Sequence, residues 1–227
     1  MKISVCIPTF NGAEVLSDCI QSVLNQTYKD IEIVLCNDGS TDSTQDLINY
    51  YVKLDNRVVG VTIEHSGISV ARQTAVDRSS GEYIAIMDTD CQMDKSRLKT
   101  QLRTIKDISY SDYYMAMPNG QIGYVPAGSM EDKKVKDILD RKFPNSNQIV
   151  PNFTIMARKE CFKDVYRPQY KVNDDLILII EWIKRGYDFK YIRKPLVMHK
   201  QTGYNVSQTK YDEVLGITNE IRKEENV

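Results

Sequence analysis

The chain has 227 residues, of which 41% are hydrophobic and 27% are charged, and its formal net charge at pH 7 is −1. This composition argues against a disordered chain, and the charge gives no overall attraction for nucleic acid or an anionic membrane. No apolar run reaches the length of a bilayer span, so we expect one soluble, cytoplasmic domain, with peripheral membrane contact left open. The five scattered cysteines lack Cys-x-x-Cys spacing, which favours reduced thiols over a zinc or redox site.

The first 90 residues alternate strands with helices. Near-continuous apolar runs predict strands at residues 3–7, 31–36, 58–63 and 83–87. Apolar residues at helical spacing between these runs predict helices at residues 15–24, 43–54 and 69–78. Strands that are apolar on both faces suit a parallel sheet covered by helices, so this part predicts an α/β, Rossmann-like half with three layers.

The later residues follow a different pattern. We expect a helix at 94–105 and a hairpin at 112–125 that turns at Pro118, Asn119 and Gly120. The remaining expected elements are a charged helix at 130–142, a strand at 149–157, a helix at 176–185, a strand at 189–192 and a polar tail at 210–227. This half therefore does not continue the regular alternation of the first.

Two carboxylates follow the strand predicted at residues 83–87. Asp88 and Asp90 are two residues apart, so on an extended backbone their side chains point the same way. Ligands of open α/β sheets bind outside the carboxyl ends of the strands, where this pair could hold a hard cation, or a cation and a sugar hydroxyl. Two solvated acids in a polar loop are the alternative interpretation.

Two other segments occupy comparable positions. Asp38 lies in the turn after the strand at 31–36, where its carboxylate could accept a hydrogen bond from a ring N–H. Arg72, in the first turn of the helix after Gly67, could reach an acid of the site or a diphosphate. An ordinary capped loop and an exposed helical arginine remain the alternatives.

In sequence order, several short motifs together resemble the family 2 glycosyltransferases, inverting enzymes with the GT-A fold that use nucleotide-diphospho-sugars. The resemblance spans roughly residues 1 to 209. Its motifs are residues 5–11, 21–27, 37–42, 67–72 and 80–84, the Asp88-Thr89-Asp90 triplet, the Asp174-Asp175 pair and His199. The order of the set is specific, although each motif alone is weak.

The resemblance implies a single GT-A domain with a mixed central sheet. Residues 1–90 would bind the nucleotide-sugar, and residues 91–209 would bind the acceptor and supply the base. The nucleotide pocket would be lined by Thr9, Asn11, Asp38 and Arg72. Asp88 would face the ribose, the metal or both, and Asp90 would ligate Mn²⁺ or Mg²⁺.

His199 is implied as a metal ligand or diphosphate contact, against the alternative of a structural histidine after the last strand. Val197 stands where the family often has arginine, which leaves Lys194, Lys200 or Arg193 to neutralise the diphosphate. A bound divalent cation would offset the charge that develops on the leaving diphosphate.

The resemblance implies that Asp175, with Asp174 as second choice, is the base that deprotonates the acceptor. The expected reaction is one sugar transfer, from a UDP-sugar in most of the family, because the Gln-x-x-Arg-Trp segment of processive synthases is missing. The acceptor stays open among saccharide, lipid-linked, protein and modified-nucleotide hydroxyls, and a homodimer is also left open. The alternatives are a non-catalytic nucleotide-sugar-binding module and a sugar nucleotidyltransferase, which would normally carry a glycine-rich signature after the first strand.

Overall fold

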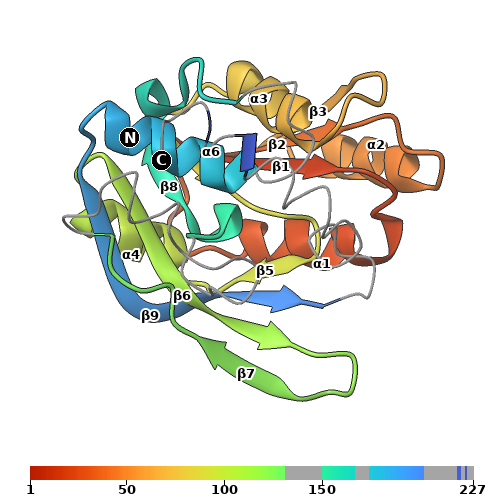
Figure 1. Ribbon diagram of the computed structural model, residues 1–227. Coiled ribbons are helices and arrows are strands. Elements are labelled where there is room, and N and C mark those ends of the chain that lie inside the picture. The colour runs from red at the N-terminus through yellow and green to blue at the C-terminus, as the bar shows by residue number, and fades with distance from the viewer. Residues whose placement is uncertain (131–149, 167–173, 202–218, 221–222, 224–227) are drawn as a thin grey trace.

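A computed structural model describes residues 1–130, 150–166, 174–201, 219, 220 and 223. Its centre is one mixed sheet in the order β3-β2-β1-β4-β8-β6-β9-β5, with β7 paired to β6 (Figure 1). The strands are β1 (Ile3–Thr9), β2 (Ile31–Asn37), β3 (Val58–Thr62), β4 (Tyr83–Ile86), β5 (Cys91–Met93), β6 (Ile108–Ala116), β7 (Ile122–Val125), β8 (Met156–Arg158) and β9 (Phe189–Lys200). Strands from both halves of the chain therefore share one sheet.

The predicted alternation of the first half is confirmed. Strands β1 to β4 are parallel, and between them run α1 (Ala13–Leu24), α2 (Thr44–Leu54) and α3 (Ile68–Arg78). Side chains of β1 alternate between the faces, so Val5 packs with α1 and α2 while Cys6 packs with α3. Figure 1 shows α3 and α1 on opposite sides of β1, the three-layer arrangement that strands apolar on both faces require.

The second half adds antiparallel strands to this sheet. β8 pairs antiparallel with β4 and β6, and β6 runs parallel to the long strand β9. The predicted hairpin is confirmed as β6 and β7, with Gly120 at a φ of 82° in the turn. The helix predicted at 94–105 is α4 (Arg97–Thr104), and the one predicted at 176–185 is α6 (Asp174–Lys184).

Two predicted strands need correction. The strand expected at 149–157 is shorter, because residues Asn152–Thr154 form the 3-10 helix η1, whose Thr154 hydroxyl donates to the Pro151 carbonyl. The strand expected to end at residue 192 continues to Lys200. The register with β6 shifts locally where Pro195 lies opposite Asp112, and the two strands remain paired on both sides of this irregularity. His199 thus lies inside β9 and not after it.

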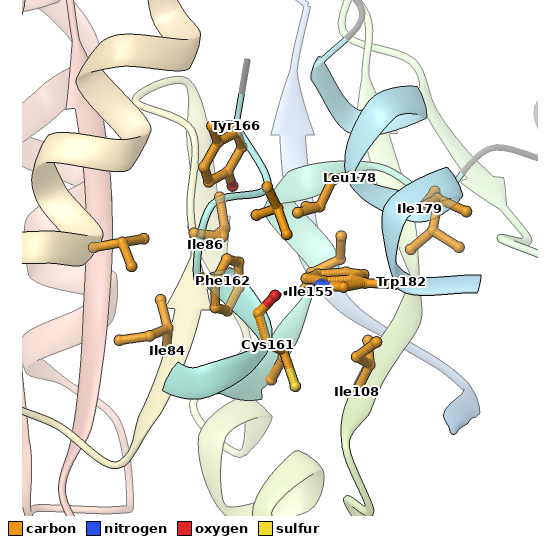
Figure 2. Close-up of a cluster of buried hydrophobic side chains, with 14 of the residues drawn as sticks. Ile84, Ile86, Ile108, Ile155, Cys161, Phe162, Tyr166, Leu178, Ile179 and Trp182 are labelled. Atoms are coloured by element: carbon orange, nitrogen blue, oxygen red, sulfur yellow. Dashed lines mark hydrogen bonds between the residues drawn. The ribbon is translucent and has the colours of Figure 1, made fainter. Parts of the chain in front are cut away.

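A hydrophobic cluster lies between the sheet and α6 (Figure 2). Trp182 is fully buried there, as expected of a core position, and its Nε1 donates to the Cys161 carbonyl at 2.7 Å. Cys161 lies in the 3-10 helix η2 (Lys159–Phe162), and Phe162 meets the Trp182 ring edge to face at 5.3 Å. Leu176 and Ala71 belong to this cluster, so α6 and α3 cover the same face of the sheet.

The five cysteines are free and buried, as predicted. In the part of the chain that the structure describes, no helix has the length and apolar character needed to cross a membrane. The helix predicted at 130–142 and the polar tail fall almost wholly outside the described residues. The cytoplasmic location and the homodimer stay predictions.

Candidate active site

The site begins where β1 and β2 end side by side. Thr9 pairs with Asn37 in the parallel register, and the Asp38 amide donates to the Thr9 carbonyl at 2.9 Å. Thr9 is buried, and its hydroxyl has no hydrogen-bond partner among the described residues. Predicted residues Thr9 and Asp38 are therefore neighbours at the carboxyl edge of the sheet, which is where ligands of such sheets bind.

Asp38 is held by the loop between β3 and α3. Its carboxylate accepts hydrogen bonds from the Ser66 amide at 2.7 Å and the Gly67 amide at 3.0 Å. Gly67 has a φ of 95°, a conformation that side chains disfavour, and this turns its amide toward Asp38. His65 Nδ1 lies 2.9 Å from Asp38 Oδ2. The carboxylate thus fixes a loop that sequence reasoning did not connect to it.

An aromatic surface lies beside Asp38. The rings of Phe10 and His65 stack with centroids 4.2 Å apart and planes inclined by 25°. Both remain open to solvent, since Phe10 is 46% exposed and the His65 side chain 58%. Neither residue is assigned a role from the sequence, although a phenylalanine directly after Thr9, where the first strand ends, is a usable signal.

Asn11 joins the first two loops of the site. It has a φ of 48°, its amide donates to the Ser40 hydroxyl, and its side-chain oxygen accepts from the Thr41 amide at 2.8 Å. Asp42 reaches back in turn to accept from the Ala13 amide at 3.2 Å. In this structure Asn11 is thus a connector between the loops after β1 and β2.

The two acids of the Asp88-Thr89-Asp90 triplet have different partners. Arg72 Nη2 donates to Asp88 Oδ1 at 2.5 Å, and the Arg72 side chain is only 5% exposed. Asp90 Oδ2 lies 3.3 Å from His199 Nε2. The predicted site residues Arg72, Asp88, Asp90 and His199 are therefore brought together pairwise.

The pairing of β5 with β9 sets the second of these contacts. Cys91 lies opposite His199 in the antiparallel register, and the Lys200 amide donates to the Asp90 carbonyl at 2.9 Å. Burial lowers the pKa of His199, but the hydrogen bond that its ring donates to Asp90 and the charges of Asp90 and Asp88 outweigh this and leave the pKa raised. A carboxylate oxygen and an imidazole nitrogen at this separation are suitable ligands for a divalent cation.

The cations considered for the diphosphate have other contacts as well. Lys200 Nζ pairs with Asp18 Oδ2 at 2.6 Å. Because Lys200 directly follows His199, this ammonium lies near the proposed metal ligands. Lys194 Nζ lies 3.2 Å from the Ser96 hydroxyl, and the Arg193 guanidinium lies over the Tyr191 ring. Val197 is buried.

The predicted bases lie at the start of α6. Asp175 is half-buried, and its Oδ1 accepts a hydrogen bond from the Leu176 amide at 2.9 Å. Asp174 is the first residue of α6, and its side chain is outside the described part of the structure. Asp175 thus lies at the start of a helix that packs on the same face of the sheet as α3.

Gln26, in the motif at residues 21–27, has a structural role. Gln26 is fully buried, its Nε2 donates to the Asp94 carbonyl at 2.8 Å, and its Oε1 accepts from the Leu98 amide. It therefore ties the end of α1 to the segment that opens α4. Its place in the motif set thus has a packing explanation.

The sequence matches the family described as "Glycosyl transferase family 2" over residues 4–166. The chain belongs to glycosyl transferase family 2. Among its relatives is TuaG of Bacillus subtilis, provisionally named a teichuronic acid biosynthesis glycosyltransferase, with 26% identity over 92% of this chain and 82% of TuaG. The glycosyltransferase GlyG of Streptococcus pneumoniae is also 26% identical, over 92% of this chain and 74% of GlyG.

The solved structure of S. aureus TarS in complex with UDP-GlcNAc is similar in fold, with a TM-score of 0.73 and 22% identity over 93% of this chain and 62% of that one. A longer TarS chain is covered to 40%. This likeness confirms the predicted GT-A fold. The family and its relatives make this protein a glycosyltransferase, which removes the non-catalytic binding module and the nucleotidyltransferase as the leading alternatives.

Proposed function

We propose that this family 2 glycosyltransferase transfers one sugar from a UDP-sugar to an acceptor hydroxyl, with inversion at the anomeric carbon. The observation that carries the proposal is a set of three contacts: Thr9 and Asp38 are neighbours at the ends of β1 and β2, and after β4 Asp88 pairs with Arg72 and Asp90 with His199. Residues of these types at the carboxyl edge of the sheet suit a nucleotide base, a ribose, a diphosphate and a cation.

The nucleotide would lie against the loops after β1 and β2. The Phe10 and His65 rings offer a flat surface for a base, next to Asp38, whose oxygens have lone pairs left for a ring N–H. The buried Thr9 hydroxyl, without a partner among the described residues, supports a ligand at this point. TarS, which shares the fold, was crystallised with UDP-GlcNAc.

The diphosphate would lie between Arg72 and the Asp90 and His199 pair. A divalent cation held by Asp90 and His199 would supply electrostatic stabilisation of the leaving diphosphate when bound. Arg72 is fixed by Asp88 and adds a buried positive charge on the same edge. Lys200 directly follows His199, and its ammonium would neutralise the diphosphate in place of the arginine that the family often has at the position of Val197.

Asp175 would act as the base for the acceptor. Its carboxylate would take the hydroxyl proton as the acceptor oxygen forms a bond to the anomeric carbon, on the side opposite the breaking bond to the UDP oxygen. The electron pair of that bond leaves with UDP, and attack from the opposite side inverts the anomeric carbon. The name of TuaG supports a saccharide acceptor, with lipid-linked, protein and modified-nucleotide hydroxyls as other outcomes of an acceptor screen.

The test is a panel of nucleotide-sugars with Mn²⁺, in which released nucleoside diphosphate is measured and the anomeric configuration of the product is read by NMR. Asp175→Asn should lower kcat by about 10²–10⁴-fold and leave donor affinity unchanged. Asp174→Asn is the matched control and should keep most of the activity. Equal kcat in wild type and Asp175→Asn would show that the base is another group.

Removal of metal tests the cation. EDTA should stop turnover of wild type, and added Mn²⁺ or Mg²⁺ should restore it. Asp90→Asn should bind Mn²⁺ more weakly by about 10-fold or more, since a carboxylate ligand is lost. Full activity in EDTA would refute a role for a cation while leaving sugar transfer itself open.

A further inference from the structure

Cys91 is adjacent to both residues that are proposed to hold the cation. It follows Asp90 in the chain and lies opposite His199 in the β5 and β9 pairing. It is only 1% exposed, and its Sγ lies 3.5 Å from Asp90 Oδ1. One ligand atom each from Asp90, Cys91 and His199 lies within 4.8 Å of the other two. The scattered spacing of the cysteines does not predict a metal site at Cys91.

We propose that Cys91 is a third ligand at this site, so that the site binds Zn²⁺ or a similarly soft divalent ion in preference to Mn²⁺. Asp90, Cys91 and His199 would each supply one ligand atom, and the fourth position would stay open to water or a phosphate oxygen. This assignment of Cys91 rests on the proposed function only because both place the cation at Asp90 and His199. Zn²⁺ would therefore compete with Mn²⁺ for the same residues.

Two of the three separations between ligand atoms fit a tetrahedral ion, and the third, from Cys91 to His199, is at most 4.8 Å. Typical bond lengths are about 2.3 Å to sulfur and about 2.0 Å to nitrogen and oxygen, which at tetrahedral angles give separations of about 3.5 Å for S···O and about 3.3 Å for N···O. The structure has 3.5 Å from Cys91 Sγ to Asp90 Oδ1 and 3.3 Å from His199 Nε2 to Asp90 Oδ2. The contacts use different oxygens of Asp90, so binding requires the carboxylate to turn or to bind through both.

The donor set also points to a soft ion. A thiolate and an imidazole favour Zn²⁺ and Co²⁺ over Mg²⁺ and Mn²⁺, and divalent affinities of mixed sites rise from Mn²⁺ toward Zn²⁺. Binding would displace the thiol proton, as it does in other cysteine sites. The two strands hold the ligands by backbone pairing, so little ordering is left to be done when the ion binds.

The experiment uses Co²⁺ as an optical probe, because a thiolate ligand gives a charge-transfer band in the near ultraviolet. Wild-type protein titrated with Co²⁺ should develop this band, and Cys91→Ser should not. Cys161→Ser is the matched control, since Cys161 is equally buried but its Sγ lies against the Asp107 carbonyl in another cluster. Removal of Cys91 should also lower the ratio of Zn²⁺ to Mn²⁺ affinity by at least about tenfold.

Binding of Co²⁺ without the band, or no binding of Co²⁺ at all, would overturn the proposal. If Cys91→Ser does not fold, X-ray absorption of the Zn²⁺-loaded wild type decides, with one sulfur neighbour expected and a shell of only nitrogen and oxygen contradicting it. The two proposals fail separately: sugar transfer with Mn²⁺ and no sulfur ligand removes this one, whereas a sulfur ligand in a protein without transfer removes the proposed function.

Discussion

Arg72 Nη2 and Asp88 Oδ1 are 2.5 Å apart, and this contact ties the first turn of α3 to the loop that follows β4. The other acid of the triplet, Asp90, faces His199 instead. The spacing of the two carboxylates predicts that they could converge on one cation, or on a cation and a sugar hydroxyl; in the structure one contacts a guanidinium and the other an imidazole. Asp88 therefore holds the Arg72 side chain in place, and Asp90, beside an imidazole, is the better candidate for a cation ligand.

The Arg72 and Asp88 pair should contribute measurably to stability, because both side chains are mostly buried. We expect Arg72→Met to lower the free energy of unfolding by about 1–3 kcal/mol, since it leaves a partly buried carboxylate without its charged partner. A double-mutant cycle with Asp88→Asn, measured by urea denaturation, gives the coupling energy. The exposed pair Lys106 and Asp188 serves as control and should couple by less than about 0.5 kcal/mol. Equal coupling in the two cycles would contradict this prediction.

The first half of the fold follows from its hydrophobic pattern, whereas the second half depends on contacts between distant residues. Strands β1, β2 and β4 are apolar on both faces, which predicts their burial without further information. β5 has only three residues, too few for a hydrophobic pattern to predict a strand, and its pairing with β9 makes it one. Pro151 and the Thr154 hydroxyl override the apolar run that predicted a strand at 149–157.

The same division applies to the site. Motif order identified Asp90 and His199, but their 3.3 Å contact depends on the β5 and β9 register, which no local pattern reveals. The turn sequence predicts that the Asp38 carboxylate accepts from a ring N–H of a ligand, whereas in the structure it accepts hydrogen bonds from two amides of the loop before α3. Partners of this kind are brought together by the sheet, so the sequence around Asp38 contains no sign of them.

The aromatic surface beside Asp38 should contribute to nucleotide affinity. Phe10→Ala should weaken UDP binding by about 1–3 kcal/mol, the usual range for a base stacked on an aromatic ring, with little change in stability because Phe10 is 46% exposed. Isothermal titration with UDP measures the effect. Tyr50→Ala removes an aromatic ring that is 57% exposed on α2 and should leave affinity unchanged. Wild-type affinity in Phe10→Ala would mean that the base binds elsewhere.

Glu32 should make stability depend on pH in the acid range. Its carboxylate accepts from the Ser4 and Ser80 hydroxyls and the Ser80 amide, and it pairs with Lys2 at 2.9 Å. Burial raises its pKa, but these hydrogen bonds outweigh burial and lower the pKa to about 2. Because the folded value lies below the unfolded value of about 4.3, the stabilisation is complete above the unfolded pKa and is lost as pH falls toward 2.

Glu32→Gln should therefore lower the free energy of unfolding by about 2–3 kcal/mol at pH 7, and the difference from wild type should shrink as the pH falls from about 5 to 3. Urea denaturation at a series of pH values measures both. Glu82→Gln, which changes an acid whose side chain is 64% exposed, should show no such pH-dependent difference. A constant difference between wild type and Glu32→Gln across this range would exclude the charge of Glu32 as its cause.

Replacement of Arg97 by lysine should destabilise the protein. It is fully buried, and its guanidinium donates to the Ile86 carbonyl at 3.1 Å, the Ile155 carbonyl at 3.0 Å and Gln101 Oε1 at 2.9 Å. These contacts fix the end of β4 just before Asp88. A planar guanidinium can donate to all three acceptors at once, whereas a lysine ammonium cannot reach them with the same geometry. We therefore expect Arg97→Lys to lower the free energy of unfolding, measured by urea denaturation, by about 2–3 kcal/mol.

The pH dependence of that variant separates lost geometry from lost charge. Burial lowers the pKa of an amine, so the introduced lysine should release its proton on folding, and stability should rise with pH up to the unfolded value of about 10.4. The deficit of Arg97→Lys should thus be smaller at pH 10 than at pH 7. Arg103→Lys, on the exposed face of α4, should stay within about 0.5 kcal/mol of wild type at both. A deficit that does not change with pH would mean that the new ammonium remains charged, and that the loss comes from hydrogen-bond geometry alone.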